Sequence, residues 1–402
     1  MRKIGTIIGL LIYRYAPIKR NRFVFTSFNG HYSDNTKSIS IKLHEIDAHA
    51  EIIWLVKREY MSILPDYAKA IDIESFRAYW YRGTASMLID NVYGYRGIFK
   101  YSDGFLNNLK FKINCFFHSK KRQPIVTTMH GTAIKKIGRD QVGNIVLDMF
   151  CPNTVLLVGD EHTAEVLKRV TFEKIPVEVT GAPRNDVLFQ NNKLKNQINL
   201  PEDKKIILFA PTFRNDGRDV AGKNVYRSGL AQLNDMDFEL LFKSLYEKFG
   251  GDWVMVCRFH YHVEKMVNWA ELEYKYPGKF INGNIYDDMA DYLSCADILV
   301  SDSSSCMCDF ALTKKPCFIF FPDMDNYENN ERGFYIDLYD TPFPVSKDFG
   351  SFIDNIKNFD QKNYDAKVNF FLKKIGSHDD GNAAYRVVEY MQNLENGGRG
   401  DI

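Results

Sequence analysis

A histidine and a lysine follow a predicted strand in the first half of the chain. The segment MHGTAIKKIG begins where the apolar run IVTTM at 125–129 ends, so His130 lies at the carboxyl end of a strand and Lys135 follows in the next turn. Gly131 permits a sharp turn of the backbone. An imidazole can accept a proton from an attacking hydroxyl, and a lysine can hold a phosphate. The pattern predicts acid–base chemistry on a phosphate; a hydrogen-bonded structural histidine is the alternative.

Two later strand ends carry further cations. The run ILFAPTFRND at 207–216 contains Arg214, and WVMVCRFHYH at 253–262 contains Arg258 and His260. Residues two apart on a strand point to one face, so Arg258 and His260 can act on the same anion. Pairing with a buried carboxylate would produce the same pattern.

The segment ADILVSDSSSCMCDF at 296–310 predicts a strand followed by the start of a helix. Asp302 ends the strand, Ser304 or Ser305 can cap the helix, and Asp309 lies on the same helix face as Ser305. Helix-start amides and serine hydroxyls can bind a phosphate without a metal. Their attraction is worth only about 0.3 to 2 kcal/mol, so cationic side chains must help to hold a diphosphate. An ordinary serine-rich cap is the alternative.

Short apolar runs that alternate with longer helical patterns must position these motifs, and they predict parallel sheets built from strand–helix–strand units. The polar segment 190–205 separates two series of such runs, which predicts an N-terminal domain at 1–195 and a C-terminal domain at 196–402. The last helix can pack back on the N-terminal domain. The fold class is therefore α/β with two doubly wound, Rossmann-like domains, and a cleft between them would lie at the carboxyl ends of the strands. The predicted strands are 23–28, 52–56, 86–90, 125–129, 155–159, 206–210, 253–257, 297–301 and 317–321, and the predicted helices are 160–171, 236–249, 287–296, 304–313, 363–374 and 382–395.

Composition excludes several classes of protein. The 402 residues are 45% hydrophobic and 26% charged, which is typical of globular domains rather than disordered chains. A net charge of +1 argues against a general nucleic-acid binder. The seven cysteines include no CxxC pair and indicate free thiols in a reducing compartment. No metal site is predicted, because Cys306 and Cys308 lack a second ligand pair at zinc-site spacing.

Two segments have the composition of a membrane-surface contact. The apolar run at 4–13 is flanked by Arg and Lys residues and is too short to span a bilayer. Residues 98–122 combine five phenylalanines with six cations and one aspartate, a local charge of +5. Interleaved basic and aromatic residues suit an anionic membrane surface. A first helix packed on its own domain, and a solvated loop, are the respective alternatives.

Several motifs in one order resemble the CDP-glycerol glycerophosphotransferase family, which contains teichoic-acid primases and polymerases and their capsule-building relatives. The resemblance covers most of the chain, and it rests on SFNGHYSDNTKSI at 27–39, HGTAIKKIG, TGAPRNDVLF at 180–189, APTFR, RFHYH, the segment 296–338 and DDGNAAYRVVEYM near the end. It implies a GT-B architecture whose C-terminal domain holds the CDP donor. It also implies functional roles for His130 and His260, a donor site at Asp302, Ser304 and Ser305, and a nearby loop that reaches Arg332; no metal or cofactor is implied.

The expected activity is transfer of glycerol phosphate, or a similar polyol phosphate, from a CDP-activated donor to a lipid-linked or polymeric acceptor, with release of CMP. We expect a peripheral protein on the cytoplasmic face of the membrane, in teichoic-acid or capsule-type synthesis. Members of the family usually have Trp before the HG pair and Pro after the second histidine, where this chain has Met129 and Tyr261. These departures bear on the choice of acceptor or polyol. The alternatives are a GT-B glycosyltransferase that uses a nucleotide sugar, a CDP-ribitol-dependent transferase, and a membrane-surface scaffold with a degenerate site.

Overall fold

The computed structural model describes the chain in segments. The described residues are 2–28, 30–91, 99–101, 116, 120, 122–140, 147–149, 151, 153–170, 175–190, 194–212, 214–218, 224–227, 230–259, 267–330 and 333–397.

The chain divides into two compact units that exchange short segments. The first unit comprises Met1–Thr132, Ile137–Asp186 and Ile375–Ile402, and the second comprises Ala133–Lys136 and Val187–Lys374. The division after Asp186 falls nine residues before the predicted boundary at 195. The last helix, α15 (Ala383–Glu395), lies in the first unit, where it packs against α2 (Asp34–Ile46).

The first unit contains a seven-stranded parallel sheet in the order β3-β2-β1-β4-β6-β8-β9. Chain order reverses between β1 and β4, as in doubly wound folds. The strands are β1 (Arg22–Phe25), β2 (Glu51–Val56), β3 (Ala68–Asp72), β4 (Met87–Asn91), β6 (Ile125–Thr128), β8 (Thr154–Val158) and β9 (Val177–Val179), and a separate antiparallel pair joins β5 (Phe99–Tyr101) to β7 (Leu147–Met149).

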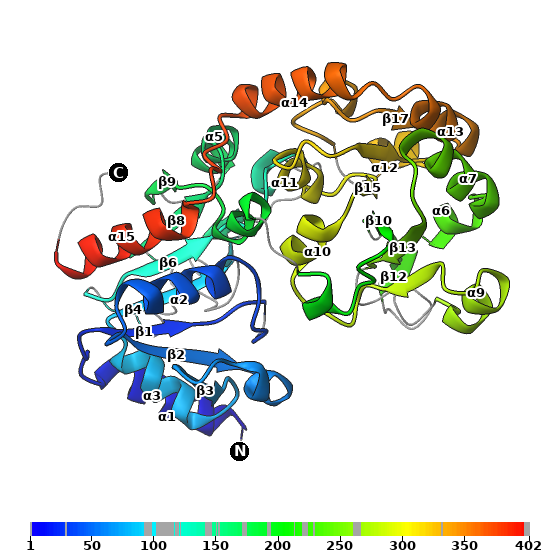
Figure 1. Cartoon of the computed structure of the whole chain (residues 1–402). Coiled ribbons are helices and arrows are strands. Elements are labelled where there is room, and N and C mark those ends of the chain that lie inside the picture. The colour runs from blue at the N-terminus through cyan, green and yellow to red at the C-terminus, as the bar shows by residue number, and fades with distance from the viewer. Residues whose placement is uncertain are drawn as a thin grey trace. The chain divides into compact units, whose positions relative to one another are not determined.

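Helices cover both faces of this sheet because its strands are apolar on both faces. Phe23 and Phe25 of β1 lie in one core with α2 and α15, whereas Val24 lies in a second core with α1 (Arg2–Tyr15) and α3 (Phe76–Thr84) (Figure 1). Helices α1 and α3 pack closely at Gly83, where an added Cβ would lie 2.7 Å from the carbonyl oxygen of Tyr13. Among the residues of this unit that the structure describes, the remaining α-helix is α5 (Glu161–Val170).

The second unit repeats the architecture with a six-stranded parallel sheet in the order β14-β13-β10-β15-β16-β17. Here chain order reverses between β10 and β15. The strands are β10 (Lys205–Ala210), β13 (Trp253–Cys257), β14 (Phe280–Asn282), β15 (Ile298–Ser301), β16 (Cys317–Phe320) and β17 (Val345–Ser346), with an antiparallel pair of β11 (Arg214–Arg218) and β12 (Asn224–Arg227). The helices are α6 (Leu230–Asn234), α7 (Phe238–Phe249), α9 (Trp269–Lys275), α10 (Met289–Cys295), α11 (Cys306–Ala311), α12 (Met324–Asn330), α13 (Phe349–Lys357) and α14 (Gln361–Ile375).

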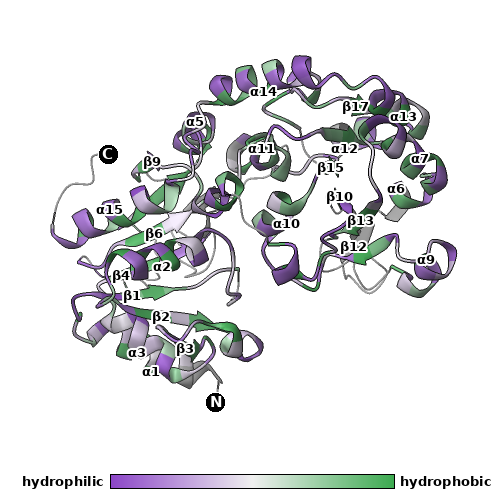
Figure 2. Cartoon of the chain, in the orientation of Figure 1, coloured by the Kyte–Doolittle hydropathy of each residue, from purple (hydrophilic) through white to green (hydrophobic). Residues whose placement is uncertain are grey.

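Every predicted strand and helix is present, with ends shifted by a few residues. Hydrophobic residues dominate strands such as β1 and β13, whereas α14 and α15 contain both hydrophilic and hydrophobic residues along their length (Figure 2). The sequence patterns missed the edge strands β3, β9, β14 and β17, the paired strands β5, β7, β11 and β12, and the helices α2, α3, α6, α9, α12 and α13. The missed edge strands are short and largely half-buried, so they have few apolar residues to mark them.

Candidate functional site

Polar loops meet at the carboxyl edge of the first sheet, at the point where chain order reverses. The loop after β1 is tied to the end of β4, because the Phe28 amide donates a hydrogen bond to Oδ1 of Asn91 at 3.0 Å. Phe28 has a φ of 24°, an unusual value for a residue with a side chain. Open α/β sheets bind ligands at such reversal points.

His130 lies at this edge, directly after β6, and its side chain is exposed. The ring of Phe28 lies edge-on to its imidazole, with 6.2 Å between ring centroids. Gly131 has a φ of 152°, within the region that favours glycine, so the backbone turns as its position in the sequence predicted. His130 is therefore presented to solvent from the end of a buried strand.

Two family motifs that are far apart in the chain, TGAPRNDVLF at 180–189 and DDGNAAYRVVEYM near the end, are joined by hydrogen bonds in this unit. The Asp186 carboxylate accepts hydrogen bonds from the amides of Ala383 and Ala384 at 2.9 and 2.8 Å, which caps the start of α15. Arg386 donates to the carbonyl of Thr180 at 2.8 Å. Burial raises the pKa of Asp186. The segment DDGNAAYRVVEYM thus has a structural role in the first unit.

In the second unit, Asp302 joins the two loops at the reversal point. Its buried carboxylate accepts hydrogen bonds from the amide and the hydroxyl of Thr212 at 2.9 and 2.7 Å, and also from the amide of Ser303. Thr212 follows β10 and Asp302 follows β15. Asp302 therefore connects the loops that follow β10 and β15 through hydrogen bonds to its carboxylate.

The serines after Asp302 begin the short helix α11. The Cys306 amide donates to Oγ of Ser304 at 3.4 Å, whereas Ser305, at the N-cap position, makes no side-chain capping hydrogen bond. Both serines are half-buried, and Asp309 is buried in the helix. Ser305 thus occupies the N-cap position without a capping hydrogen bond, and Ser304, one residue earlier, accepts from the first amide of the helix.

Arg258 has a structural role that the sequence did not indicate. Its Nη1 donates to the carbonyl oxygen of Gly283 at 2.7 Å and to that of Tyr286, and its Nη2 donates to that of Asp287. The guanidinium also lies over the ring of Tyr292, 5.4 Å from the centroid. These contacts hold the loop that follows β14, so the described contacts of Arg258 go to backbone carbonyls rather than to a carboxylate partner.

Lys135 belongs to the short segment that joins the second unit. It forms an isolated bridge with Phe334, and the neighbouring Lys136 amide donates to the carbonyl of Gly333 at 2.9 Å. The Lys135 ammonium lies 5.7 Å from the ring centroid of Tyr327. Lys135 is thus held beside the loop that the resemblance associates with the donor.

Three predicted site residues are described only in part or not at all. Arg214 is the first residue of β11, and the structure describes its backbone alone. His260 and Arg332 lie outside the described residues. Within the described segments, no group of three or more His, Cys, Asp or Glu side chains is arranged to hold a metal ion.

Comparison with known families and proteins gives one family for nearly the whole chain. Residues 10–393 match the family described as CDP-glycerol:poly(glycerophosphate) glycerophosphotransferase. A teichoic acid glycerol-phosphate transferase of Staphylococcus aureus is 28% identical over 405 residues, covering 92% of each chain. A teichoic acid poly(glycerol phosphate) polymerase of Staphylococcus epidermidis is 26% identical over 93% of this chain and 51% of its own length. The chain spans about half the length of this relative and of its Bacillus subtilis counterpart.

Solved structures share the fold. The wall teichoic acid polymerase TagF matches with a TM-score of 0.74 and 23% identity, over 98% of this chain and 97% of that one. This match confirms the predicted fold class, a GT-B architecture with two Rossmann-like units.

Proposed function

We propose that this chain, which belongs to the CDP-glycerol:poly(glycerophosphate) glycerophosphotransferase family, transfers glycerol phosphate from CDP-glycerol to a hydroxyl of a polymeric or lipid-linked acceptor. The family match over residues 10–393 is the observation that carries this proposal. The acceptor oxygen attacks the β-phosphorus of the donor, the bond from that phosphorus to the bridging oxygen breaks, and CMP leaves. Catalysis of such a transfer depends on positioning and on electrostatic stabilisation of the phosphoryl oxygens.

Each predicted site residue except Asp309, which is buried in α11, has a proposed role in this reaction. His130 removes the proton of the acceptor hydroxyl, and His260 stabilises the transferring phosphoryl group. Asp302 orders the loops that receive the donor, with Ser304 and Ser305 beside its diphosphate. Arg258 acts indirectly through the loop that it holds. The cations proposed to neutralise the diphosphate are Lys135, Arg214 and Arg332.

The test is a CMP-release assay on the purified chain with a lipid-linked glycerol-phosphate acceptor. CDP-glycerol should support turnover, whereas a nucleotide sugar should not. Release from the nucleotide sugar alone would instead indicate a glycosyltransferase. Absence of both turnover and binding of CDP by calorimetry would favour a scaffold with a degenerate site.

Ribitol is the second candidate for the polyol. A teichoic acid poly(ribitol-phosphate) polymerase of Bacillus spizizenii is 32% identical, but over only 54% of this chain. The glycerol-phosphate relatives named above match over 92 to 93% of it. CDP-ribitol is therefore the direct competitor in the same assay, and faster CMP release from it would change the proposed donor.

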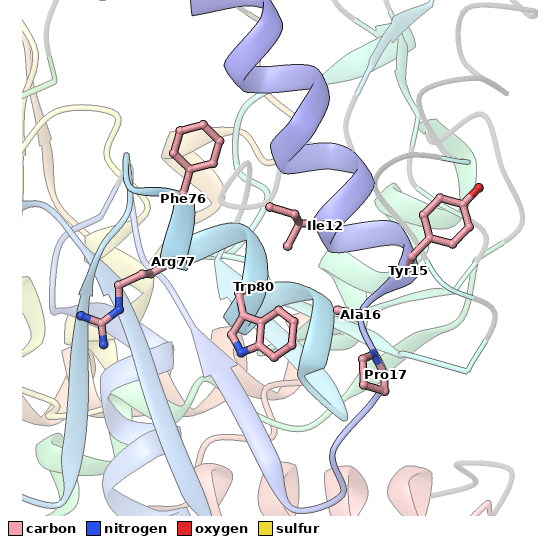
Figure 3. Close-up of a pocket in the computed structure, with 7 residues that line it drawn as sticks. All are labelled: Ile12, Tyr15, Ala16, Pro17, Phe76, Arg77 and Trp80. Atoms are coloured by element: carbon pink, nitrogen blue, oxygen red, sulfur yellow. The ribbon is translucent and has the colours of Figure 1, made fainter.

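We also propose that the outer surface of α1 and α3 contacts an anionic membrane. The apolar side chains of this face remain solvent-exposed although α1 packs on its own unit: the exposed fractions are 58% for Ile7, 55% for Phe76 and 48% for Trp80. A hollow of about 570 Å³ opens between the two helices, and Figure 3 shows its lining residues, namely Ile12, Tyr15, Ala16, Pro17, Phe76, Arg77 and Trp80.

Basic residues accompany this apolar face. Arg14 lies over the ring of Phe116, 4.2 Å from its centroid, and Arg77, which lines the hollow, is exposed. An apolar face bordered by cations is typical of helices that lie in the plane of an anionic membrane surface. None of the described helices has both the length and the hydropathy required to cross a membrane.

One cation of the basic segment 98–122, Lys120, is not available for contact with a membrane. Lys120 is buried, and its ammonium donates to the carbonyl of Ala16 at 2.7 Å and to that of Gly83. Burial lowers its pKa to about 8. Lys120 therefore ties together the ends of α1 and α3, and most of the remainder of residues 98–122 lies outside the described residues.

The double substitution Ile7→Glu with Phe76→Glu should weaken binding to vesicles that contain phosphatidylglycerol by at least about tenfold. Each apolar side chain withdrawn from the membrane costs about 1.5 to 3 kcal/mol, and 1.4 kcal/mol corresponds to tenfold. Vesicle sedimentation at low and high salt measures the effect. Phe370→Glu, on an exposed position of α14, is the matched control and should bind as the unaltered chain does. The proposal would be contradicted if vesicle binding were the same with and without anionic lipid and the same for the double variant as for the unaltered chain.

A further inference from the structure

Asn35 bonds directly to the backbone that carries His130. Its side-chain Nδ2 donates a hydrogen bond to the carbonyl oxygen of Met129 at 2.8 Å, and Met129 immediately precedes His130. Only 1% of Asn35 is exposed. A buried amide at this position restricts the last peptide before the imidazole, which is itself exposed.

Asn35 is in turn fixed from two directions. Its Oδ1 accepts a hydrogen bond from the Arg184 amide at 3.0 Å. The Arg184 guanidinium pairs with Asp34 at 3.3 Å, and the two side chains are only 7% and 14% exposed. Asp34 begins α2 with a φ of 63°, a conformation that residues with a Cβ rarely adopt. The Asp34 carboxylate also accepts a hydrogen bond from the Asn35 amide at 2.7 Å.

The other side of the His130 turn is anchored as well. The Thr132 hydroxyl donates to Oδ2 of Asp160 at 2.9 Å, and Oδ1 of the same buried carboxylate accepts from the Thr163 amide at 2.7 Å. His130 therefore lies between two anchored residues, Met129 and Thr132. Because the anchors act on the turn that carries His130, they can set the position of its imidazole.

We propose that Asn35 is a positioning residue for the reaction and acts by holding the Met129 carbonyl so that His130 meets the acceptor hydroxyl. This inference rests on the proposed function, in which His130 is the general base. It assigns Asn35 an effect on turnover rather than on donor binding. A displacement of about 1 Å in a catalytic group can lower a rate about 10²-fold.

The experiment compares Asn35→Ala and Asn35→Asp with Ser40→Ala. Asn35→Asp keeps the size and the acceptor for the Arg184 amide but loses the donor to Met129. Ser40 is a buried control on the same helix whose hydroxyl donates within α2, to the carbonyl of Lys37 at 2.9 Å. Both Asn35 variants should lower kcat for CMP release by about 30- to 100-fold and leave KM for CDP-glycerol within about twofold. Ser40→Ala should retain the kcat of the unaltered chain.

A second measurement does not depend on turnover. Nitrogen-15 spectra of the histidine rings, with the His130 signal assigned from a His130→Ala spectrum, should show a shift or broadening of that signal in both Asn35 variants. If the unaltered chain released no CMP, the proposed function would be wrong. The histidine ring spectra would still show whether Asn35 positions His130.

Three outcomes would overturn the inference. They are an Asn35→Asp variant with unaltered kcat and an unaltered His130 signal, an equal loss of kcat in Ser40→Ala, and failure of both Asn35 variants to fold as judged by thermal melting. The last result would assign Asn35 to the stability of the fold rather than to His130.

Discussion

Replacement of His130 by alanine is expected to lower kcat for CMP release from CDP-glycerol by about 10³-fold, within the range of about 10² to 10⁴ for loss of a general acid or base. The side chain is exposed at the carboxyl end of β6, so its removal leaves no cavity in the core. The melting temperature and the affinity for CDP should therefore remain close to those of the unaltered chain. Steady-state kinetics with saturating donor and acceptor, together with calorimetry for CDP, measure both parts of this expectation.

His49→Ala is the control for this substitution, because His49 is also exposed but lies in the turn that precedes β2, before the strand rather than after it. It should leave kcat unchanged. Near-normal CMP release by His130→Ala at saturating donor would exclude His130 as the base. A loss of CDP binding in that variant would indicate a role in the donor site instead.

Replacement of Asp302 by alanine is expected to lower kcat/KM for CDP-glycerol by about 10²-fold and to destabilise the protein by about 3 kcal/mol. The buried carboxylate accepts hydrogen bonds from the amide and hydroxyl of Thr212 and from the amide of Ser303. Each polar group left without a partner in a buried position costs about 1 to 3 kcal/mol. Without these hydrogen bonds the loops after β10 and β15 should become more mobile. Because these loops are proposed to receive the donor, KM for CDP-glycerol should rise more than kcat falls.

Asp297→Ala separates stability from donor binding. Asp297 lies just before β15, at the opposite end of that strand, and its carboxylate accepts a hydrogen bond from the Ile206 amide at 2.8 Å. Its removal should lower the melting temperature and leave KM for CDP-glycerol unchanged. An equal rise in KM in both variants would show that Asp302 acts through general stability. Chemical denaturation and the CMP-release assay provide the two measurements.

The sequence determined much of the fold because strand and helix patterns are local. Apolar runs of four to six residues marked β1, β2, β4, β6 and β8 in the first sheet and β10, β13, β15 and β16 in the second. Polar motifs that follow such runs must lie at the carboxyl ends of parallel strands, so His130 and Asp302 could be placed at sheet edges from the sequence alone. The weak edge strands were missed because little apolar surface is buried there.

Only the tertiary structure decided what the side chains at those edges contact. Arg258 has the sequence context of an anion ligand, yet it bonds to the carbonyl oxygens of residues 283, 286 and 287. Lys120 lies in a basic segment of the sequence and is buried against α1 and α3. No local pattern marks Asn35 as a partner of Met129, 94 residues away. Periodicity depends on neighbouring residues, whereas these roles depend on hydrogen bonds and ion pairs between segments that only the folded chain brings together.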